Sequence, residues 1–286
     1  MSKYFEIYHL TRYDYSLPVQ LDEQLLRFLP LPVPTQQTLS YRLNITPTPV
    51  EILEETDRWG NRLQRVRFTG ETSVLEISVE LAVEIQTRDT GFQSAPQPLP
   101  PVYGNESASL NAYLSLLEEP ARLDDFVAPL LVASENDAWG YLGLLNEAIH
   151  AFYHEGIRLE GPPRTPAQTL QLREGVCRDL ALLFMAACRQ AGIAARFVSG
   201  YQKGSGQRQQ RFLHAWAEAC LPGRGWVGFD PTHNTVVDSE HVAIAAAPVP
   251  EATTPVEGGY RFIGAQLNST LSSDIQIATR GQPGSC

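Results

Sequence analysis

The segment from Glu174 to Tyr201 constrains the fold of this 286-residue chain more than any other segment. Cys177 stands directly before a helical pattern whose apolar side chains occupy most of both faces: Leu180, Leu182, Leu183, Phe184, Met185, Ala186, Ala187 and Ala191. A helix that is apolar nearly all round is a core helix. Gly192 is expected to end this helix by adopting a positive φ, and residues 193–201 then predict a strand.

The position of Cys177 gives its thiol a possible chemical role. Unpaired N–H groups and the helix dipole at a helix N-terminus stabilise a thiolate and lower the pKa of the thiol. The simpler interpretation is a small buried hydrophobe, which is what most free cysteines are. Cys188, in the middle of the same helix, is expected to be one. The residues that follow decide between the two interpretations for Cys177.

A hairpin pattern follows the cysteine helix. In residues 212–219, His214, Trp216 and Glu218 alternate with alanines, which predicts a strand packed closely on one face. After a turn at 222–225, a second short strand ends at Asp230. Such a hairpin brings His214 near Asp230. Thiol catalysis needs this set: a thiolate, an imidazole that moves the proton, and a carboxylate that orients the imidazole. A lone histidine in a strand is more often structural, but this order of groups is much more specific.

Several motifs in this region resemble a known family. Gly-Val-Cys-Arg-Asp-Leu, Val-Ser-Gly-Tyr, His-Ala-Trp-Ala-Glu and Gly-Trp-Val-Gly-Phe-Asp-Pro-Thr-His-Asn are similar to the core of the bacterial transglutaminase-like superfamily, within the papain-like thiol enzymes. The resemblance covers roughly residues 144–234 and implies a catalytic nucleophile at Cys177, a catalytic histidine at His214 and a catalytic acid at Asp230. Residues 8–16 and 26–30 resemble the β-rich N-terminal region that accompanies this core in bacteria.

The expected fold is α+β, with an N-terminal antiparallel β-sandwich-like domain followed by a papain-like core in which the Cys-bearing helix packs on an antiparallel sheet. The strict alternation of residues 74–86 is the clearest strand pattern, and residues 139–153 and 167–172 have helical patterns. The expected domains are an N-terminal β domain (1–90), a proline-rich linker (91–109), a catalytic core (110–235) and a β-like tail (236–286), which should close against one of the two domains.

Composition limits the partners and the compartment. A net charge of −10 argues against a nucleic-acid or anionic-membrane partner. No apolar run approaches the roughly 18 residues of a membrane span, and the start has no apolar signal core. The four cysteines form no CxxC, which fits reduced thiols and a cytoplasmic location. No cofactor and no metal are expected, and no EF-hand-like calcium loop is present in the sequence.

The expected reaction is acyl transfer from an amide of a peptide or protein substrate through a thioester. Hydrolysis, with water as acceptor, is favoured. A protein-glutamine transglutaminase with an amine acceptor, and a non-catalytic peptide-binding scaffold, are the alternatives. A zinc site of Cys177, His214 and Asp230 is weaker because it lacks a fourth ligand. The loop at 156–166 is expected to form one wall of the groove. The basic stretch 203–211 is either a solvated loop or a rim that contacts an acidic or amide-rich substrate.

Overall fold

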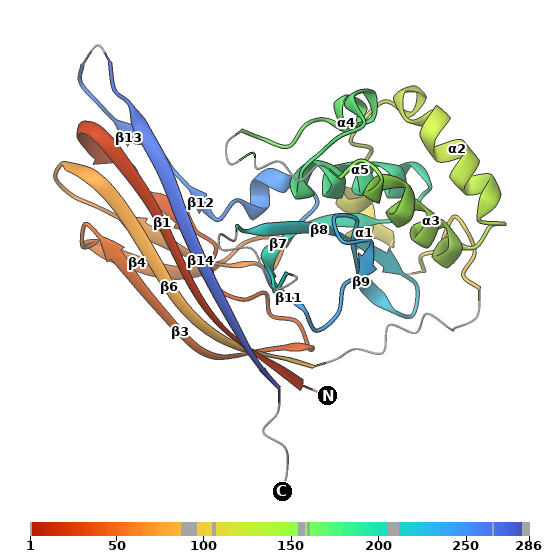
Figure 1. Ribbon diagram of the computed structural model, residues 1–286, viewed down its shortest axis with the longest axis horizontal. Helices are drawn as coiled ribbons and strands as arrows, with labels where there is room; N and C mark the ends of the chain where they lie inside the picture. Colours follow the sequence, from red (N-terminus) through yellow and green to blue (C-terminus); the bar gives the residue numbers. More distant parts are fainter. Residues whose placement is uncertain are drawn as a thin grey trace, which may run out of the picture.

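The computed structural model describes residues 2–86, 96–104, 107–153, 158, 161–204, 212–264 and 266–281. Within these residues the chain forms two parts, with long curved strands on one side of Figure 1 and a helix-covered sheet on the other. The helices and the antiparallel sheets lie in separate stretches of the sequence, so the predicted α+β class is confirmed.

The N-terminal part is built on the alternating pattern predicted at 74–86, which is strand β6 (Thr72–Gln86). It pairs antiparallel with β1 (Ser2–Leu21) and with β3 (Gln36–Thr46). A smaller sheet contains β2 (Gln24–Leu26), β4 (Glu51–Thr56) and β5 (Arg62–Arg67). Both sheets bury apolar side chains in one common core, which includes Phe5, Ile7, Leu26, Val66, Leu75 and Ile77.

The second part consists of helices packed on a sheet of strand order β10-β9-β8-β7-β11. The strands are β7 (Ala195–Gln202), β8 (His214–Leu221), β9 (Gly225–Asp230), β10 (Thr235–Val236) and β11 (His241–Ala247). The helices are α1 (Ser107–Leu114), α2 (Asp124–Ala133), α3 (Ala138–His150), α4 (Pro166–Leu172) and α5 (Cys177–Gln190). The alanines of β8 join the side chains of α5 in one core, which explains how the helix and strand approach closely.

The predicted central helix is α5, whose first residue is Cys177. Gly192 has a φ of +76° just after the helix, and the N–H of Ile193 donates to the carbonyl of Cys188 at 2.8 Å. Thr165 caps α4 as its threonine-proline signature predicts, accepting from the N–H of Gln168 at 3.2 Å. Helix α2 was not expected, because a proline in its interior, Pro129, argues against a helix.

The C-terminal segment contributes strands to both parts. Strand β11 pairs with β7 at the edge of the core sheet, and β12 (Val256–Glu257) pairs with β2. Strands β13 (Tyr260–Arg261) and β14 (Ser269–Gly281) both pair with β1. The expected tail is therefore divided between the two parts. Residues 87–95 of the proline-rich stretch, most of the 203–211 loop, several residues of the 156–166 loop and Cys286 lie outside the described residues.

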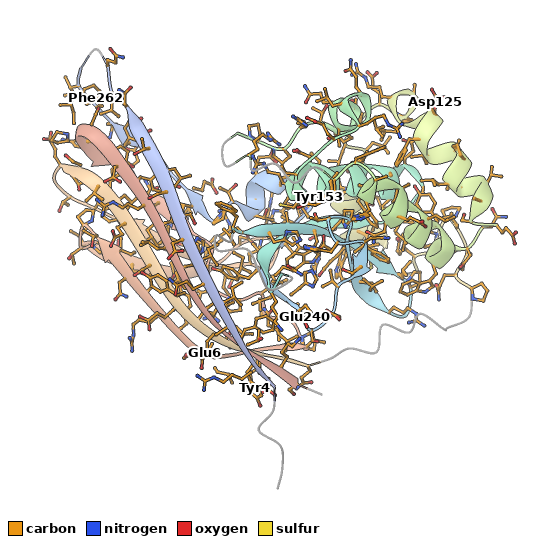
Figure 2. The ribbon with its side chains drawn as sticks, in the orientation of Figure 1. Tyr4, Glu6, Asp125, Tyr153, Glu240 and Phe262 are labelled. Atoms are coloured by element: carbon orange, nitrogen blue, oxygen red, sulfur yellow. The ribbon has the colours of Figure 1, made fainter. Side chains whose placement is uncertain are left out.

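Side chains tie the two parts together. The side-chain amide of Gln36 forms two hydrogen bonds with the backbone of Ala243, at 2.8 and 2.9 Å. Figure 2 shows Glu240 on the side of the core that faces the start of β1, where it forms an ion pair with Lys3. Among the described residues, no helix has both the length and the apolar character needed to cross a membrane.

Candidate active site

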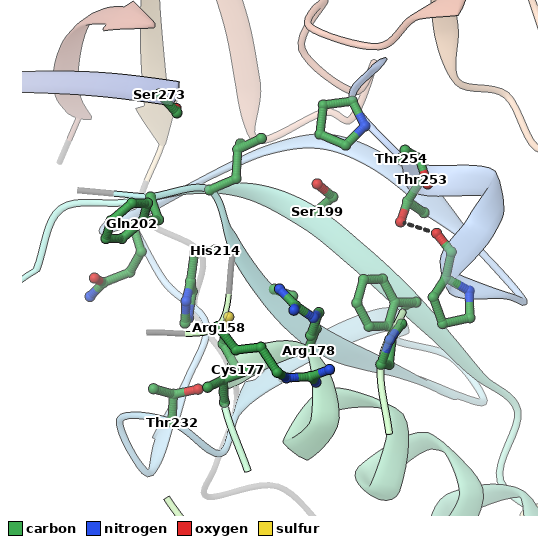
Figure 3. A pocket seen from close by; sticks show the side chains of 18 of the residues that line it. Arg158, Cys177, Arg178, Ser199, Gln202, His214, Thr232, Thr253, Thr254 and Ser273 are labelled. Atoms are coloured by element: carbon green, nitrogen blue, oxygen red, sulfur yellow. Dashed lines mark hydrogen bonds between the residues drawn. The ribbon is translucent and has the colours of Figure 1, made fainter. Parts of the chain in front are cut away.

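The three side chains predicted from the sequence converge at one end of the core sheet. Cys177 is the first residue of α5, His214 the first of β8 and Asp230 the last of β9. Nε2 of His214 lies 2.8 Å from Oδ2 of Asp230. Figure 3 shows the thiol of Cys177 beside the imidazole of His214, near enough for His214 to lower the pKa of the thiol. The structure thus places a thiol beside an imidazole that is hydrogen-bonded to a carboxylate.

The pKa values of the three groups move in directions that favour a charged pair. Burial favours the neutral imidazole, but the charge and hydrogen bond of Asp230 outweigh it and raise the pKa of His214 to about 10. Burial also favours the neutral thiol, yet the hydrogen bond and charge of His214 and an N–H bond from Ala215 lower the pKa of Cys177 overall. Both shifts favour the charged pair of thiolate and imidazolium over the neutral pair of thiol and imidazole.

The carboxylate of Asp230 is fully buried and is shared by three imidazoles. Its Oδ2 accepts from His214, from Nδ1 of His233 at 2.7 Å and from Nε2 of His241 at 3.0 Å, while Oδ1 accepts the N–H of Thr232 at 3.0 Å. These hydrogen bonds and the charge of His214 hold the pKa of Asp230 well below its ordinary value, although burial alone would raise it. The carboxylate stays ionised at any pH near neutrality.

Sequence reasoning gave no role to His233 or to His241. His233 was inside the Asp-Pro-Thr-His-Asn motif, and its closeness to Asp230 in the chain was the available signal. His241 opens β11, which is separated from β8 by β7, so only the sheet order brings its side chain near Asp230. No spacing rule in the sequence predicts that contact.

A metal ion does not fit between these groups as they are arranged. Ligand atoms of His214, Asp230 and His241 lie within 4.8 Å of one another. Both imidazole nitrogens, however, lie within 3.0 Å of the same carboxylate oxygen, in direct hydrogen bonds. An ion about 2 Å from each ligand would have to displace those bonds. The two imidazoles and the carboxylate are therefore arranged to hydrogen-bond one another rather than to bind zinc.

The N-terminus of α5 is fixed by a second buried carboxylate, that of Asp179. Its oxygens accept the N–H groups of Val176 at 3.1 Å and of Arg164 at 2.8 Å, and it forms an ion pair with Arg158. The loop before α4 and the first turn of α5 are thereby joined. This arrangement holds Cys177 in place and supports the expectation that the loop borders the groove.

The thiol opens into a cavity of about 690 Å³ that both parts of the molecule line. The core contributes Cys177, His214 and Phe197, whereas β1 and β14 contribute Thr11 and Ser273. Figure 3 shows Cys177 and His214 side by side, with hydroxyl-bearing residues on the opposite side of the cavity. A cavity of this size accommodates a small ligand or a few residues of a peptide.

Two family descriptions match separate stretches of the chain. Residues 5–84 match the "Bacterial transglutaminase-like N-terminal region", and residues 146–231 match the "Transglutaminase-like superfamily". These stretches coincide with the N-terminal strands and with the part of the core that contains Cys177, His214 and Asp230. Both are regions in which the motifs already suggested the same resemblance.

Individual relatives agree with these matches. An uncharacterised protein of Mycobacterium tuberculosis is 26% identical over 257 residues, which cover 84% of this chain and 82% of that protein. A protein-glutamine gamma-glutamyltransferase of Pseudomonas aeruginosa is 36% identical over 103 residues, 32% of this chain and 15% of that protein. The crystal structure of a "Putative Cysteine Protease" from Cytophaga hutchinsonii covers 100% of this chain and 93% of its own, with a TM-score of 0.76 at 21% identity, and so shares the fold.

Proposed function

The chain belongs to the transglutaminase-like superfamily of cysteine-dependent acyl-transfer enzymes, and we propose that it hydrolyses an amide bond of a peptide or protein substrate through a thioester on Cys177. The observation that carries this proposal is the thiol of Cys177 beside an imidazole, that of His214, which is hydrogen-bonded to the buried carboxylate of Asp230. The pKa of each of the three groups is shifted in the direction that favours the charged form the reaction needs at its start.

The proposed reaction starts from the thiolate of Cys177, which attacks the carbonyl carbon of the amide. Backbone N–H groups at the first turn of α5 lie beside the nucleophile and are suited to stabilise the negative oxygen of the tetrahedral intermediate. His214, as imidazolium, donates its proton to the leaving amine, and a thioester remains on Cys177. Water, deprotonated by the now neutral His214, attacks the thioester and releases the acid and the thiolate. Asp230 orients His214 and stabilises its positive charge throughout.

Transfer to an amine is the second candidate, because the stretch shared with the P. aeruginosa protein-glutamine gamma-glutamyltransferase is 36% identical. The two reactions use the same three residues and differ in how well water is kept from the thioester. Polar side chains line the cavity on several sides, including Thr11, Thr232 and Ser273, which supports access of water. We therefore favour hydrolysis. The cytoplasmic location expected from the sequence stays a prediction.

The acyl acceptor is tested with a library of peptides and glutamine-containing peptides, incubated with the protein with and without an added primary amine. Mass spectrometry is expected to detect free acid and new amino termini, and no incorporation of the amine. Amine incorporation in place of hydrolysis would favour the transglutaminase reaction. Turnover by Cys177→Ala equal to that of the wild type would reject catalysis by this cysteine.

The charged pair is tested by the pH dependence of alkylation at Cys177. His214→Ala removes the main influence that lowers the pKa of Cys177 and leaves burial, which raises it, so this pKa should rise to the ordinary value of about 8.5 or above. The rate of reaction with iodoacetamide, followed by peptide mass spectrometry, increases as the thiolate forms, and in this variant the increase should occur at higher pH than in the wild type. Identical pH profiles would contradict the pairing.

A further inference from the structure

His233 is a second imidazole that binds the carboxylate of Asp230 and also lines the cavity. Its Nδ1 lies 2.7 Å from Oδ2 of Asp230, the oxygen that also accepts from Nε2 of His214. The side chain of His233 is 36% exposed, whereas that of His214 is 11% exposed. His233 is therefore anchored to the same atom as His214 and is the more open of the two imidazoles.

The bond to Asp230 determines which nitrogen of His233 is left over. The carboxylate is ionised and can only accept, so in neutral His233 the proton is on Nδ1 and the lone pair is on Nε2. The five-membered ring directs its two nitrogens to nearly opposite sides, so Nε2 points away from the buried carboxylate. No described residue forms a hydrogen bond with Nε2. His233 therefore has an unpaired hydrogen-bond acceptor on its open edge.

The ring of His233 is also the accessible neighbour of the catalytic imidazole. It packs edge-on against the ring of His214, with centroids 5.2 Å apart. Trp216 and His241 also contact His214, with centroids 6.2 Å away in each case. Both are buried, and neither is among the described residues that line the cavity. Of these three rings, His233 is the one that a molecule in the cavity can reach.

The reaction places a water molecule beside these two imidazoles. In the proposed hydrolysis His214 takes a proton from the water that attacks the thioester, so this water must lie within hydrogen-bond distance of His214. The water has a second O–H group that needs an acceptor. Nε2 of His233 is an unpaired acceptor on the ring next to His214. A water held at both O–H groups keeps its oxygen directed at the thioester carbon, which favours the attack.

We propose that His233 positions the water that resolves the thioester, by accepting a hydrogen bond at Nε2. The inference rests on the proposed hydrolysis and specifies its second step. One proton of the water goes to His214. The oxygen forms a bond to the thioester carbon, the carbon–sulfur bond breaks, and the sulfur of Cys177 leaves as thiolate. The second proton, which points at His233, stays with the acid product.

The test separates formation of the thioester from its hydrolysis, and it needs no knowledge of the natural substrate. p-Nitrophenyl acetate transfers its acetyl group to the sulfur of Cys177 and releases p-nitrophenolate, whose absorbance gives the rate of acetylation. After desalting, peptide mass spectrometry follows the loss of the acetyl group from Cys177. The variant is His233→Asn, because an asparagine amide retains an N–H near the position of Nδ1 for Asp230 and lacks the acceptor at Nε2.

The wild type should lose the acetyl group about a hundredfold faster than S-acetylglutathione, the size of effect that a positioned base gives. His233→Asn should lower this rate about tenfold, the value of one hydrogen bond. It should leave acetylation and iodoacetamide alkylation of Cys177 unchanged, whereas a purely structural defect would slow these steps as well. The matched control is His150→Asn. Nδ1 of His150 lies 2.9 Å from the carbonyl of Pro231, but His150 is not among the described residues that line the cavity. All its rates should equal those of the wild type.

The role of His233 would be overturned by a His233→Asn variant that loses the acetyl group at the wild-type rate, or in which acetylation and deacetylation fall equally. Rapid hydrolysis by both proteins would leave the proposed function standing. A parallel reaction contains methylamine, whose N–H can replace the O–H of water at His233. Loss of the acetyl group only with methylamine, slowed in His233→Asn, would support the positioning role and reject hydrolysis.

Discussion

Asp230 is the residue on which the geometry of the site depends. One carboxylate oxygen accepts hydrogen bonds from three imidazoles, and the second oxygen accepts a hydrogen bond from the N–H of Thr232. The donors differ in exposure: the side chain of His233 is 36% exposed, whereas that of His241 is 3% exposed. Burial holds His241 neutral by lowering its pKa, so it donates a hydrogen bond without adding a charge that would compete with His214. His241 thus positions the carboxylate, and His214 carries the positive charge.

Replacing His241 by phenylalanine removes a donor to a buried carboxylate and retains much of the volume. Hydrogen bonds to charged groups contribute about 1.5–3 kcal/mol, so we expect His241→Phe to lower the free energy of unfolding by about 2 kcal/mol. His241→Gln places an amide N–H near the position of Nε2 and should restore most of that loss. Urea denaturation at neutral pH measures both. Equal stability of the two variants would show that the bond to Asp230 contributes nothing.

At the scale of elements, the site is the meeting point of one helix start and two strand ends. Strand β7 allows this because Gly200 lies between its neighbours, opposite His214 on β8 and Ala243 on β11. A Cβ on Gly200 would lie 2.2 Å from the carbonyl oxygen of Val242 and 2.7 Å from the indole of Trp216. Trp216 in turn packs edge-on against His241, with ring centroids 5.2 Å apart. The missing side chain thus makes room for the Trp216–His241 contact.

Gly200→Ala should therefore disturb the β7–β11 pairing and the position of His241. A contact this short with backbone requires the strands to shift, and overpacking of this kind costs about 1–3 kcal/mol. The matched control is Gly143→Ala in α3, where a Cβ would meet no atom within 4 Å. This control should stabilise the protein by about 1 kcal/mol through helix propensity. Thermal unfolding compares the two, and a neutral or stabilising Gly200→Ala would contradict the packing argument.

The elements with strict local patterns were the most predictable from the sequence. Strict local patterns predicted α5, the capped α4 and the alternating strand β6, because each depends on residues close in the chain. The same patterns placed Cys177 at the start of a helix, His214 on a strand and Asp230 at the end of the neighbouring strand. Helix α2 was missed because Pro129 lowers its apparent helical propensity. His233 and His241 were missed because their contact with Asp230 depends on tertiary structure.

For the whole molecule, strand pairing was the feature that the sequence could not predict. Alternation shows which face of a strand is buried but does not identify its partner. Strand β14 pairs with residues 3–15 of β1 from the opposite end of the chain, and β11 completes the core sheet. As a result, the N-terminal sheet is fixed beside the core and lines the cavity with Thr11 and Ser273. The two parts therefore act as one body around the thiol.

His9 lies at the junction of the two parts and makes their union depend on pH. It is 2% exposed. Its Nδ1 lies 3.0 Å from the hydroxyl of Tyr201 on β7, and its Nε2 lies 3.1 and 3.3 Å from the hydroxyls of Thr11 and Ser273. Burial lowers the pKa of His9 to about 4, although the nearby charge of Asp274 partly opposes this shift. The folded protein therefore holds this imidazole neutral.

The sign of the effect on stability follows from comparing the two states. The unfolded chain protonates His9 near pH 6.5, whereas the folded protein does so near pH 4. The contribution of neutral His9 to the free energy of unfolding is complete above pH 6.5. About 3 kcal/mol of this contribution is lost as the pH falls toward 4. His9→Gln keeps a polar side chain without titrating there. Its stability relative to the wild type, from urea denaturation at pH 7, 5.5 and 4.5, should therefore improve as the pH falls. A stability difference between His9→Gln and the wild type that stays constant over this range would contradict the argument. It would show that His9 is protonated equally in the folded and unfolded states, so that the junction is not the source of the acid response.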